Sequence, residues 1–217
     1  MTARTYPPKE TAVGTTWYTS DLHLGHAKII EYSRRPYKNI AEHDRALVDN
    51  WNDRVGKDDT VWVLGDMTID GGMKRGFEAL PRLRGHKRLV SGNHDRCWAG
   101  KSDAVRWIPQ YLQAGWEIVT PFARAKLGPC KVNLSHFPYI GDHTSDDRFD
   151  QWRLRPSATP LLHGHTHSRE RVNLKLVGTV QIQVGVDAWD YAPVSGHVLQ
   201  ALLESTLVTI NESERVS

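Results

Sequence analysis

The stretch TVWVLGD, residues 60–66, joins a continuous apolar run to an abrupt polar ending. Its β-branched and aromatic residues favour an extended strand, and the lack of polar alternation is typical of a strand that is buried on both faces. Such strands occur mainly in parallel sheets, whose connections place helices on the faces of the sheet. The stretch therefore predicts a strand of a helix-covered parallel sheet that ends at Asp66.

The segments on both sides of this strand alternate between strand and helix. Strands are predicted at residues 15–20 and 87–92, and helices at residues 27–33, 39–55 and 73–83. The second helix has the clearest start signal, because Asn39 is a good N-cap residue and Glu42 follows three positions later. Two consecutive βαβ units result, which is the pattern of a parallel α/β sheet.

The second half of the chain predicts short strands with little helix between them. These strands cover residues 116–120, 131–135, 159–164, 172–177 and 179–185, and a further helix covers residues 195–205. The polar stretch from Phe137 to Pro156 predicts a long loop over one end of the sheet, and long loops are often functional. We therefore predict one layered α/β domain with two sheets over residues 1–217, in which residues 1–14 form a flexible or peripheral segment.

The composition is that of an ordinary soluble globular protein. The 217 residues are 39% hydrophobic and 24% charged, with a formal net charge of +3. This charge is too small to argue for nucleic acid as a partner. The two cysteines, Cys97 and Cys130, form no metal or disulfide motif, and no apolar run is long enough for a signal peptide or a membrane span. These features predict a cytoplasmic protein that does not contact a membrane.

Polar side chains gather immediately after the predicted strands. They are Asp21 and His23 after the first strand, Asp66 after the second, Asn93, His94 and Asp95 after the third, and His136, His165 and His167 after two later strands. Each short motif alone is common in turns, which Asn and Asp favour. In open α/β sheets, however, ligands bind beyond the carboxyl ends of the strands. The joint occurrence after five strands predicts one shared polar site.

The donor types in this set indicate a metal site. Without His94 and Asp95, the set holds two carboxylates, one amide and four imidazoles but no thiolate, which suits Mn, Fe, Zn, Co or Ni. If one carboxylate bridges two ions, each ion has four protein ligands and keeps open positions for water and substrate, as catalytic sites do. Two divalent ions with two carboxylates and one hydroxide keep a net positive charge, which favours an anionic phosphate ester.

The ordered motifs D-x-H, G-D, G-N-H-D, a lone His and G-H-x-H, which span Asp21 to His167, resemble those of the calcineurin-like metallophosphoesterases. The sequence around these motifs is most similar to that of the compact bacterial and phage members of this family. The resemblance implies the four-layer αββα sandwich of two mixed β-sheets flanked by helices. It also implies two divalent ions, the first bound by Asp21, His23 and His167, the second by Asn93, His136 and His165, and both bridged by Asp66.

Five further polar residues are interpreted one by one. The resemblance makes His94 a general acid or a phosphate contact, with Asp95 orienting it. His26 either lines the mouth of the site as a substrate contact or is simply a residue at the start of a helix. His163 is expected to be a buried polar residue inside its strand. The second motif of the family is often G-D-x-x-D, whereas GDMTID here places Asp70 one residue late, which puts the conformation of this loop in doubt.

The resemblance implies hydrolysis of a phosphoester by a hydroxide that two metal ions share, with Mn favoured. The chain is short and has little room for a dedicated nucleic-acid-binding domain, so we expect a phosphodiesterase that acts on small substrates such as 2′,3′- or 3′,5′-cyclic nucleotides. A broad-specificity phosphomonoesterase, a protein phosphatase and a nuclease remain alternatives. A non-catalytic metal-binding scaffold ranks lower, because such a protein would not need all seven ligands together with His94.

Overall fold

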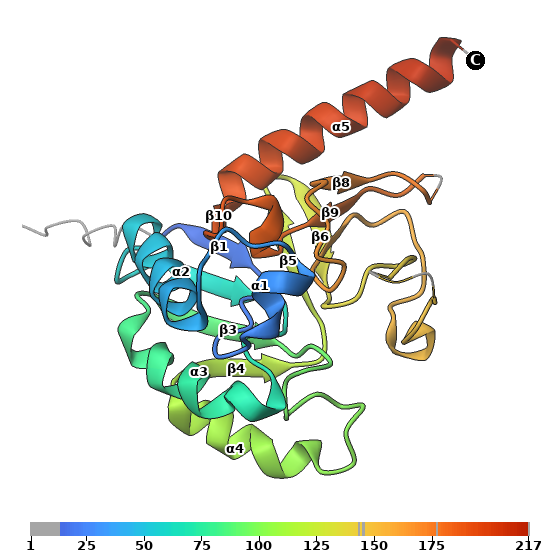
Figure 1. Cartoon of the computed structure of the whole chain (residues 1–217). Coiled ribbons are helices and arrows are strands. Elements are labelled where there is room, and N and C mark those ends of the chain that lie inside the picture. The colour runs from blue at the N-terminus through green and yellow to red at the C-terminus, as the bar shows by residue number, and fades with distance from the viewer. Residues whose placement is uncertain (1–13, 143, 145, 177, 217) are drawn as a thin grey trace, which may run out of the picture.

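Two five-stranded sheets lie at the centre of the computed structural model, which describes residues 14–142, 144, 146–176 and 178–216 (Figure 1). The first sheet has the order β10-β1-β2-β3-β4, with bounds β1 Thr16–Thr19, β2 Thr60–Val63, β3 His86–Val90, β4 Trp116–Thr120 and β10 Val194–Ser195. Strands β1 to β4 are parallel, and β10 pairs antiparallel with β1. The carboxyl ends of β1, β2 and β3 therefore meet at one edge of the sheet.

The second sheet has the order β5-β6-β7-β9-β8, with bounds β5 Ala123–Leu127, β6 Cys130–Leu134, β7 Leu161–His163, β8 Val172–Asn173 and β9 Gln181–Gln183. Strands β6, β7 and β9 are parallel, whereas the edge strands β5 and β8 are antiparallel to their neighbours. Both sheets are thus mixed, as predicted. The parallel pair β6 and β7 brings the two later histidine motifs to one edge of this sheet.

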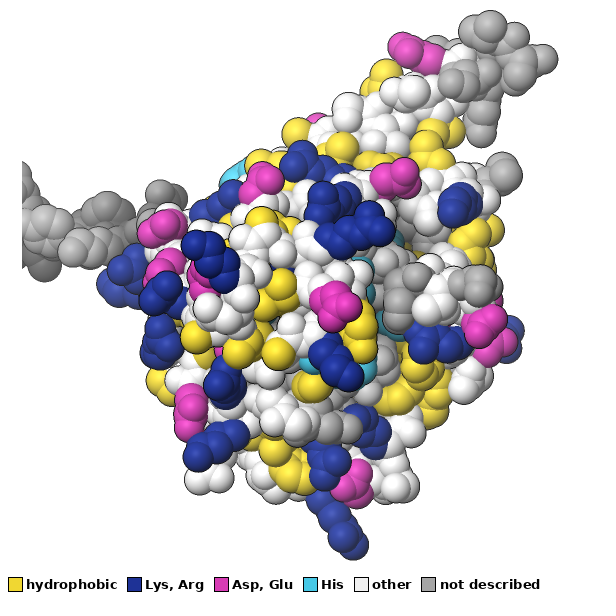
Figure 2. Space-filling model, in the orientation of Figure 1, with side chains coloured by type: hydrophobic (Ala, Val, Ile, Leu, Met, Phe, Trp, Pro, Cys, Tyr) yellow, Lys and Arg dark blue, Asp and Glu magenta, His cyan; other side chains and the backbone are white. Residues whose placement is uncertain are grey.

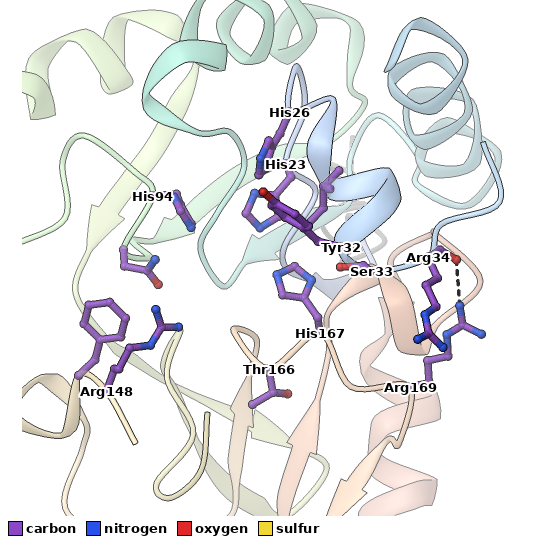
Figure 3. A pocket seen from close by; sticks show the side chains of 13 residues that line it. His23, His26, Tyr32, Ser33, Arg34, His94, Arg148, Thr166, His167 and Arg169 are labelled. Carbon is purple, nitrogen blue, oxygen red and sulfur yellow. Dashed lines mark hydrogen bonds between the residues drawn. The ribbon is translucent and has the colours of Figure 1, made fainter. Parts of the chain in front are cut away.

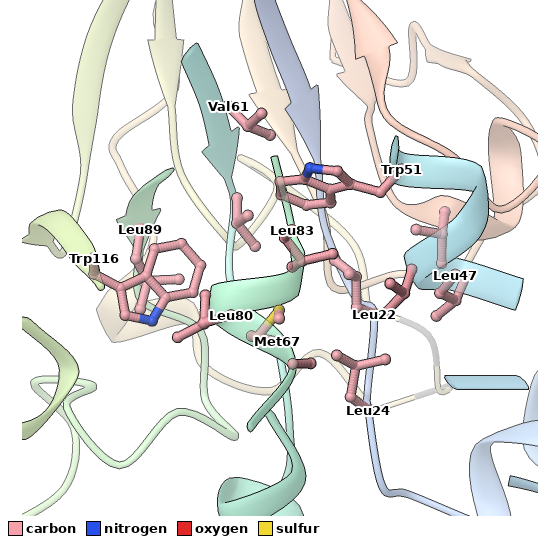
Figure 4. Packing of buried hydrophobic residues seen from close by; sticks show 14 of the residues in the cluster. Leu22, Leu24, Leu47, Trp51, Val61, Met67, Leu80, Leu83, Leu89 and Trp116 are labelled. Atoms are coloured by element: carbon pink, nitrogen blue, oxygen red, sulfur yellow. The ribbon is translucent and has the colours of Figure 1, made fainter. Parts of the chain in front are cut away.

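Helices α2 (Ile40–Arg54), α3 (Met73–Ala79) and α4 (Ala104–Ala114) cover one face of the first sheet (Figure 1). Trp51 of α2 is fully buried in the same core as Val61 of the sheet, and Leu89 and Trp116 lie farther along this core (Figure 4). Full burial of one such side chain stabilises the fold by roughly 1.5–3 kcal/mol. This packing fixes the strands whose ends carry the polar motifs.

The start of α2 follows the sequence prediction. The Asn39 side chain accepts a hydrogen bond from the Glu42 backbone N–H at 2.9 Å, and the Glu42 carboxylate accepts one from the Lys38 backbone N–H at 3.1 Å. These two bonds satisfy backbone donors that a helix start leaves unpaired. The sequence signal for this boundary therefore has a direct structural counterpart.

A second core lies between the two sheets and extends to α5 (Gly196–Val216). It joins Tyr18 of β1 to Leu134 of β6 and Ile182 of β9, while α5 contributes Leu199 and Leu203. All five side chains are at most 2% exposed. Two mixed sheets with helices on either side form the layered α/β fold that the sequence predicts.

The predicted loop from Phe137 to Pro156 includes the 3-10 turn η3 (Asp150–Trp152) and contacts the second sheet. The Tyr139 backbone N–H donates to the Gln181 side chain at 2.7 Å, and the Asn133 side chain donates to the Tyr139 hydroxyl at 2.7 Å. Asn133 belongs to β6 and Gln181 to β9. The loop is therefore anchored across this sheet near its edge, rather than projecting from it.

Several elements differ from the sequence prediction. Helix α4 and strand β5 were not predicted, because Pro109 interrupts the helical pattern of α4 and β5 alternates short apolar residues with charges. The strand predicted at 172–177 is only β8, since the Asn173 side chain accepts a hydrogen bond from the Lys175 N–H at 2.9 Å and turns the chain. Helix α5 continues far beyond residue 205, because Leu207 and Ile210 still pack against the second core.

Two sequence expectations fall on residues that the structure does not describe in full, and a third concerns membrane spans. Apart from Gly14, the predicted peripheral segment 1–14 lies outside the described residues. Asp70 begins the 3-10 turn η1 (Asp70–Gly72), but its side chain also lies outside them. Within the described helices, none is at once long enough and apolar enough to cross a membrane.

Candidate metal centre

The loops after β1, β2 and β7 share an unusual backbone conformation. Five predicted ligands have positive φ angles: Asp21 +58°, His23 +52°, Asp66 +54°, His165 +70° and His167 +49°. Residues other than glycine rarely adopt this left-handed region, and such strain is concentrated at functional sites. The backbone conformation of these loops therefore directs the five side chains toward one place.

A glycine beside this place leaves room for a ligand ring. Gly65 has φ +90°, and a Cβ atom on it would lie 2.4 Å from Nδ1 of His136. Because real Cβ atoms do not approach so closely, only glycine permits the His136 imidazole to lie against this turn. The G-D motif thus supplies space as well as the carboxylate of Asp66.

The carboxylate of Asp21 and the rings of His23 and His167 form the first group of candidate ligands. Their donor atoms lie within 4.8 Å of one another. Both ring nitrogens of His23 are buried without a hydrogen-bond partner among the described residues. Burial lowers the pKa of His23 well below its usual value, which keeps the ring neutral. A buried neutral imidazole with unsatisfied nitrogens fits a divalent metal ion.

The ring of His167 is held in a defined orientation. Its Nδ1 lies 2.9 Å from Oδ2 of Asp187, and its Nε2 lies 4.0 Å from Oδ1 of Asp21. A histidine ligand commonly donates its second ring N–H to a carboxylate, which fixes the tautomer. His167 therefore presents Nε2 to the first group, as the resemblance implies.

The second group contains Asp21, Asp66 and His136, again with donor atoms within 4.8 Å of one another. Nδ1 of His136 lies 2.8 Å from the Leu64 carbonyl oxygen, to which it donates. Its Nε2 consequently faces Oδ2 of Asp66 at 3.4 Å and Oδ1 of Asn93 at 3.0 Å. Oδ2 of Asp66 also lies 3.7 Å from Nε2 of His23. Oδ2 of Asp66 thus lies near a ring nitrogen of each group, while Asp21 is the residue that the two groups share, so the predicted bridging role of Asp66 stays a prediction.

His165 is close to both groups but belongs to neither of them. Its backbone N–H donates to both oxygens of Asp21, at 3.1 and 3.0 Å, and its ring centroid lies 5.1 Å from that of His136. Its Nε2 lies 3.1 Å from Oδ1 of Asp142. This contact is an ion-pair distance and does not by itself decide which ring nitrogen of His165 would bind a metal ion.

Asp142, which the sequence did not single out, also contacts an arginine of the same loop. The Asp142 side chain is 0% exposed, and the Arg148 guanidinium donates to its Oδ2 at 3.1 Å and its Oδ1 at 3.2 Å. The long loop therefore contributes a buried carboxylate to the environment of His165. Nothing in the local pattern GDHTSDD distinguishes Asp142 from the acidic residues that follow it.

Asp95 has a different role from the predicted one. Its Oδ2 accepts hydrogen bonds from the backbone N–H groups of Asp66 at 3.0 Å and Gly92 at 2.8 Å. Its other oxygen is buried without a hydrogen-bond partner among the described residues, and no hydrogen bond joins Asp95 to the His94 ring there. Burial and the nearby Asp66 charge raise the pKa of Asp95 to about 7. Asp95 instead joins the two loops that carry Asp66 and Asn93.

His94 lines a pocket beside the two groups. Its backbone N–H donates to Oδ1 of Asp66 at 2.9 Å, and its ring centroid lies 5.3 Å from that of His23. The ring itself faces the cavity (Figure 3). This is a suitable place for a proton donor or a phosphate contact.

His163, in contrast, does not line this pocket. It is 2% exposed within β7, and its Nδ1 donates to the Gly164 carbonyl oxygen, so it is the buried polar residue that the sequence predicts.

A buried arginine that the sequence did not reveal supports the first group. Arg35 donates to both oxygens of Asp187, at 2.9 and 2.8 Å, and to the backbone carbonyl of Asp21 at 2.7 Å. Its Nη1 also lies 2.9 Å from Nε2 of His43. Burial alone would raise the pKa of Asp187, but the contacts with His167 and Arg35 hold it below its usual value. Arg35 thus keeps the partner of His167 ionised.

The pocket over these groups is large enough for a small organic molecule. It has a volume of about 760 Å³ and includes His23, His94, Asn93 and His167 in its lining. Figure 2 shows histidine side chains inside a hollow whose surroundings carry lysine and arginine side chains. His26 lies at this pocket, 5.4 Å from His23 between ring centroids, and precedes the first residue of α1 (Lys28–Tyr32). Its predicted contact with substrate stays a prediction.

Comparisons with known proteins show the family and the fold of this chain. The family model for the calcineurin-like phosphoesterases matches residues 14–169. The Gene 66 protein of Mycobacterium phage L5 is 43% identical over 187 residues, which are 82% of this chain and 88% of the phage protein. An uncharacterized protein of Methanocaldococcus jannaschii is 30% identical over 198 residues, 89% of this chain and 94% of that protein. The crystal structure of a protein of unknown function from Aquifex aeolicus has the same fold, with a TM-score of 0.67, 23% identity, and coverage of 87% of this chain and 99% of that chain.

Proposed function

The chain belongs to the calcineurin-like phosphoesterase family, and we propose that it is a phosphodiesterase that hydrolyses small phosphodiesters, with cyclic nucleotides as its leading substrates. The observation that carries this proposal is the pair of adjacent ligand groups, Asp21–His23–His167 and Asp21–Asp66–His136, at the base of one open pocket. We further propose that Asn93 and His165 complete the second group. Two divalent ions bound there would act as Lewis acids and activate a water molecule.

The protein's own groups support hydrolysis in three ways. Asp66 and Asp21 supply the negative charge that retains the cations, and their burial strengthens this attraction. His94 faces the pocket and can protonate the leaving oxygen. The guanidinium of Arg148, at the same wall, can bind a phosphoryl oxygen. Together these groups bind the ester, stabilise charge on its oxygens and return a proton.

A diester substrate is favoured by the shape and chemistry of the cavity. A cavity of about 760 Å³ exceeds the space that a phosphate group alone requires. Phe149 and Tyr32 add aromatic surface to its walls, on which a nucleobase can stack. The nitrogen and oxygen donors are compatible with Mn²⁺ as the activating ion. A phosphomonoesterase, phosphatase or nuclease would use the same metal centre, so the substrate class needs a direct test.

The test is hydrolysis by chelator-treated protein after Mn²⁺ is added back. The substrates are bis(p-nitrophenyl) phosphate, p-nitrophenyl phosphate, and 2′,3′- and 3′,5′-cyclic AMP. We expect metal-dependent turnover of the diesters and a decrease of about 100-fold or more in kcat for His94→Ala. His197→Ala, at an exposed histidine of α5, is the matched control and should retain wild-type activity.

Each outcome assigns the protein to a class. Turnover of the monoester alone would identify a phosphatase and contradict the diesterase proposal. Absence of turnover with all four substrates, although calorimetry detects two bound Mn²⁺ ions, would favour the non-catalytic scaffold. Equal activity of His94→Ala and wild type would remove His94 from the mechanism while leaving the metal centre intact.

A further inference from the structure

Two arginines from distant parts of the chain meet at one end of the pocket. Arg34 follows α1, and Arg169 lies two residues after His167. The Arg169 guanidinium donates to the Arg34 backbone carbonyl oxygen at 3.1 Å. Figure 3 shows the two side chains together, separated from His94 and Arg148 by the central rings of His23 and His167. The pocket therefore has a second basic end beyond the metal groups.

Neither guanidinium at this end forms a salt bridge with a carboxylate of the described residues. Arg148, the third arginine in the lining of this pocket, differs in this respect, since it pairs with Asp142 at 3.1 Å. Two adjacent cations repel each other, and a bound anion would relieve that repulsion. The planar guanidinium matches the oxygens of a phosphate group in a two-bond geometry. Both arginine side chains are exposed, so an anionic ligand in the pocket can reach them.

Backbone contacts also fix the position of Arg34 beside the pocket. Arg34 has φ +49°, which is unfavourable for a residue with a side chain. Its N–H donates to the Glu31 carbonyl at 3.2 Å, while the next residue, Arg35, is fixed by its buried ion pair with Asp187. A left-handed residue directly after a helix C-cap is a common way to end a helix, and here it turns the chain after α1. The Arg34 backbone is therefore fixed beside the pocket, while its side chain is exposed.

We propose that Arg34 and Arg169 form a second phosphate subsite, and that the preferred substrate is a nucleotide carrying a phosphate in addition to the diester that is hydrolysed. This inference rests on the proposed function, because the first phosphate must bind at the metal groups. One continuous cavity connects His167 with Arg34 and Arg169, so a single molecule can occupy both ends. Tyr32 lines the same cavity and offers an aromatic surface for the nucleoside between the two phosphates.

The experiment compares 2′,3′-cyclic AMP with the same compound bearing a 5′-phosphate, using the Mn²⁺-loaded full chain. For wild type we expect kcat/KM to be roughly 10-fold to 100-fold higher for the 5′-phosphorylated compound, mainly through KM, because the added bonds are charge-assisted. In Arg34→Gln with Arg169→Gln this ratio should fall to about 1. Arg45→Gln, at an exposed arginine of α2 outside the pocket, should keep the wild-type ratio.

A second measurement does not depend on turnover. Calorimetric titration with adenosine 3′,5′-bisphosphate and adenosine 3′-monophosphate should show tighter binding of the bisphosphate to wild type and no preference in the double variant. A wild-type preference near 1 in both experiments, with diester hydrolysis intact, would overturn the subsite alone. Loss of all diester hydrolysis would overturn the proposed function, while the calorimetric preference would still report on the two arginines.

Discussion

Nδ1 of His167 lies 2.9 Å from Oδ2 of Asp187, although the two residues are 20 positions apart and follow different strands. This contact leaves Nε2 of His167 directed at Asp21. Because Asp187 is itself bound by the guanidinium of Arg35, the orientation of a candidate metal ligand depends on a buried ion pair that does not touch the pocket. Two predictions follow from this arrangement, one for metal affinity and one for stability.

Removal of the Asp187 carboxylate should weaken metal binding. In Asp187→Ala, His167 loses the acceptor that fixes its tautomer, so we expect the affinity of the first ligand group for Mn²⁺ to fall by about 10-fold to 100-fold. Calorimetric titration of chelator-treated protein measures this change. Asp190→Ala, an exposed acidic residue three positions later, is the control. Equal Mn²⁺ affinity in Asp187→Ala and wild type, with the fold intact by circular dichroism, would contradict the role assigned to Asp187.

Replacement of Arg35 should destabilise the whole fold. Arg35→Met leaves the buried carboxylate of Asp187 without its cation, and breaking a buried ion pair from one side costs about 3–5 kcal/mol. Urea denaturation should show this decrease in the free energy of unfolding. In Arg35→Met combined with Asp187→Leu no uncompensated charge remains, so part of the loss should be recovered. If the two substitutions were simply additive, the ion pair would not be the source of the instability.

The contrast between predicted and unpredicted site residues has a physical reason. Asp21, Asp66 and His136 follow strands directly, so the topology of the sheets determines where they meet, and the sequence order alone was sufficient to group them. Arg35 and Asp187 are 152 positions apart, and neither lies in a motif. Their pairing arises only from packing in three dimensions, which local patterns do not encode.

The same distinction separates the predicted from the missed secondary structure. Helix α2 has a capping signal and a buried stripe, so the sequence located it closely. In α4 the interior Pro109 removes a backbone donor, yet the packing of Tyr111 against Phe77, with ring centroids 5.0 Å apart, holds the helix in place. Tertiary contacts can thus outweigh a local signal against a helix.

Asp95 was identified as a site residue, but only the structure shows that its carboxylate accepts hydrogen bonds from the backbones of two loops.

Asp142 should influence the second ion through His165. In Asp142→Ala the ring of His165 loses a contact of 3.1 Å at Nε2, and Arg148 loses the carboxylate to which its Nε and Nη2 donate. We expect weaker binding of one Mn²⁺ ion together with a higher KM for diesters, because both a ligand and a wall of the pocket become mobile. Asp146→Ala, at an exposed position of the same loop, is the matched control. A change in KM without any change in metal affinity would limit Asp142 to positioning Arg148.

Gly164 should not tolerate a side chain. A Cβ atom at this position would lie 1.9 Å from Oγ of Ser20 and 2.5 Å from Oδ2 of Asp21, so Gly164→Ala must displace the carboxylate shared by both ligand groups. We expect loss of Mn²⁺ binding and a destabilisation of about 1–3 kcal/mol from overpacking. Gly71→Ala is the control, since a Cβ there meets nothing within 4 Å. Retention of full metal affinity by Gly164→Ala would mean that Asp21 does not need its present position.

Asp59 should make the stability of the fold depend on pH. It lies just before β2, at the end of the sheet opposite the candidate metal centre. Its carboxylate accepts hydrogen bonds from the Gly56 N–H at 2.8 Å, the Trp17 indole at 2.9 Å and the Thr15 N–H at 2.7 Å. Burial would raise the pKa of Asp59, but these three bonds outweigh it and hold the pKa below its usual value. A group whose pKa is lower in the folded state stabilises the protein above its unfolded pKa of about 4 and loses this effect as the pH falls through the folded pKa.

Thermal unfolding of Asp59→Asn and wild type between pH 7 and pH 3 tests this sign. The melting temperature of the variant should be lower at pH 7, and the gap should narrow below about pH 4, where the wild-type carboxylate also becomes protonated. Asp58→Asn is the control, because the Asp58 side chain is 70% exposed and pairs with Lys57. A difference in melting temperature that stays constant down to pH 3 would show that Asp59 stabilises the fold through its shape and not through its charge. A gap that widens in acid would mean that the folded-state pKa is raised instead of lowered.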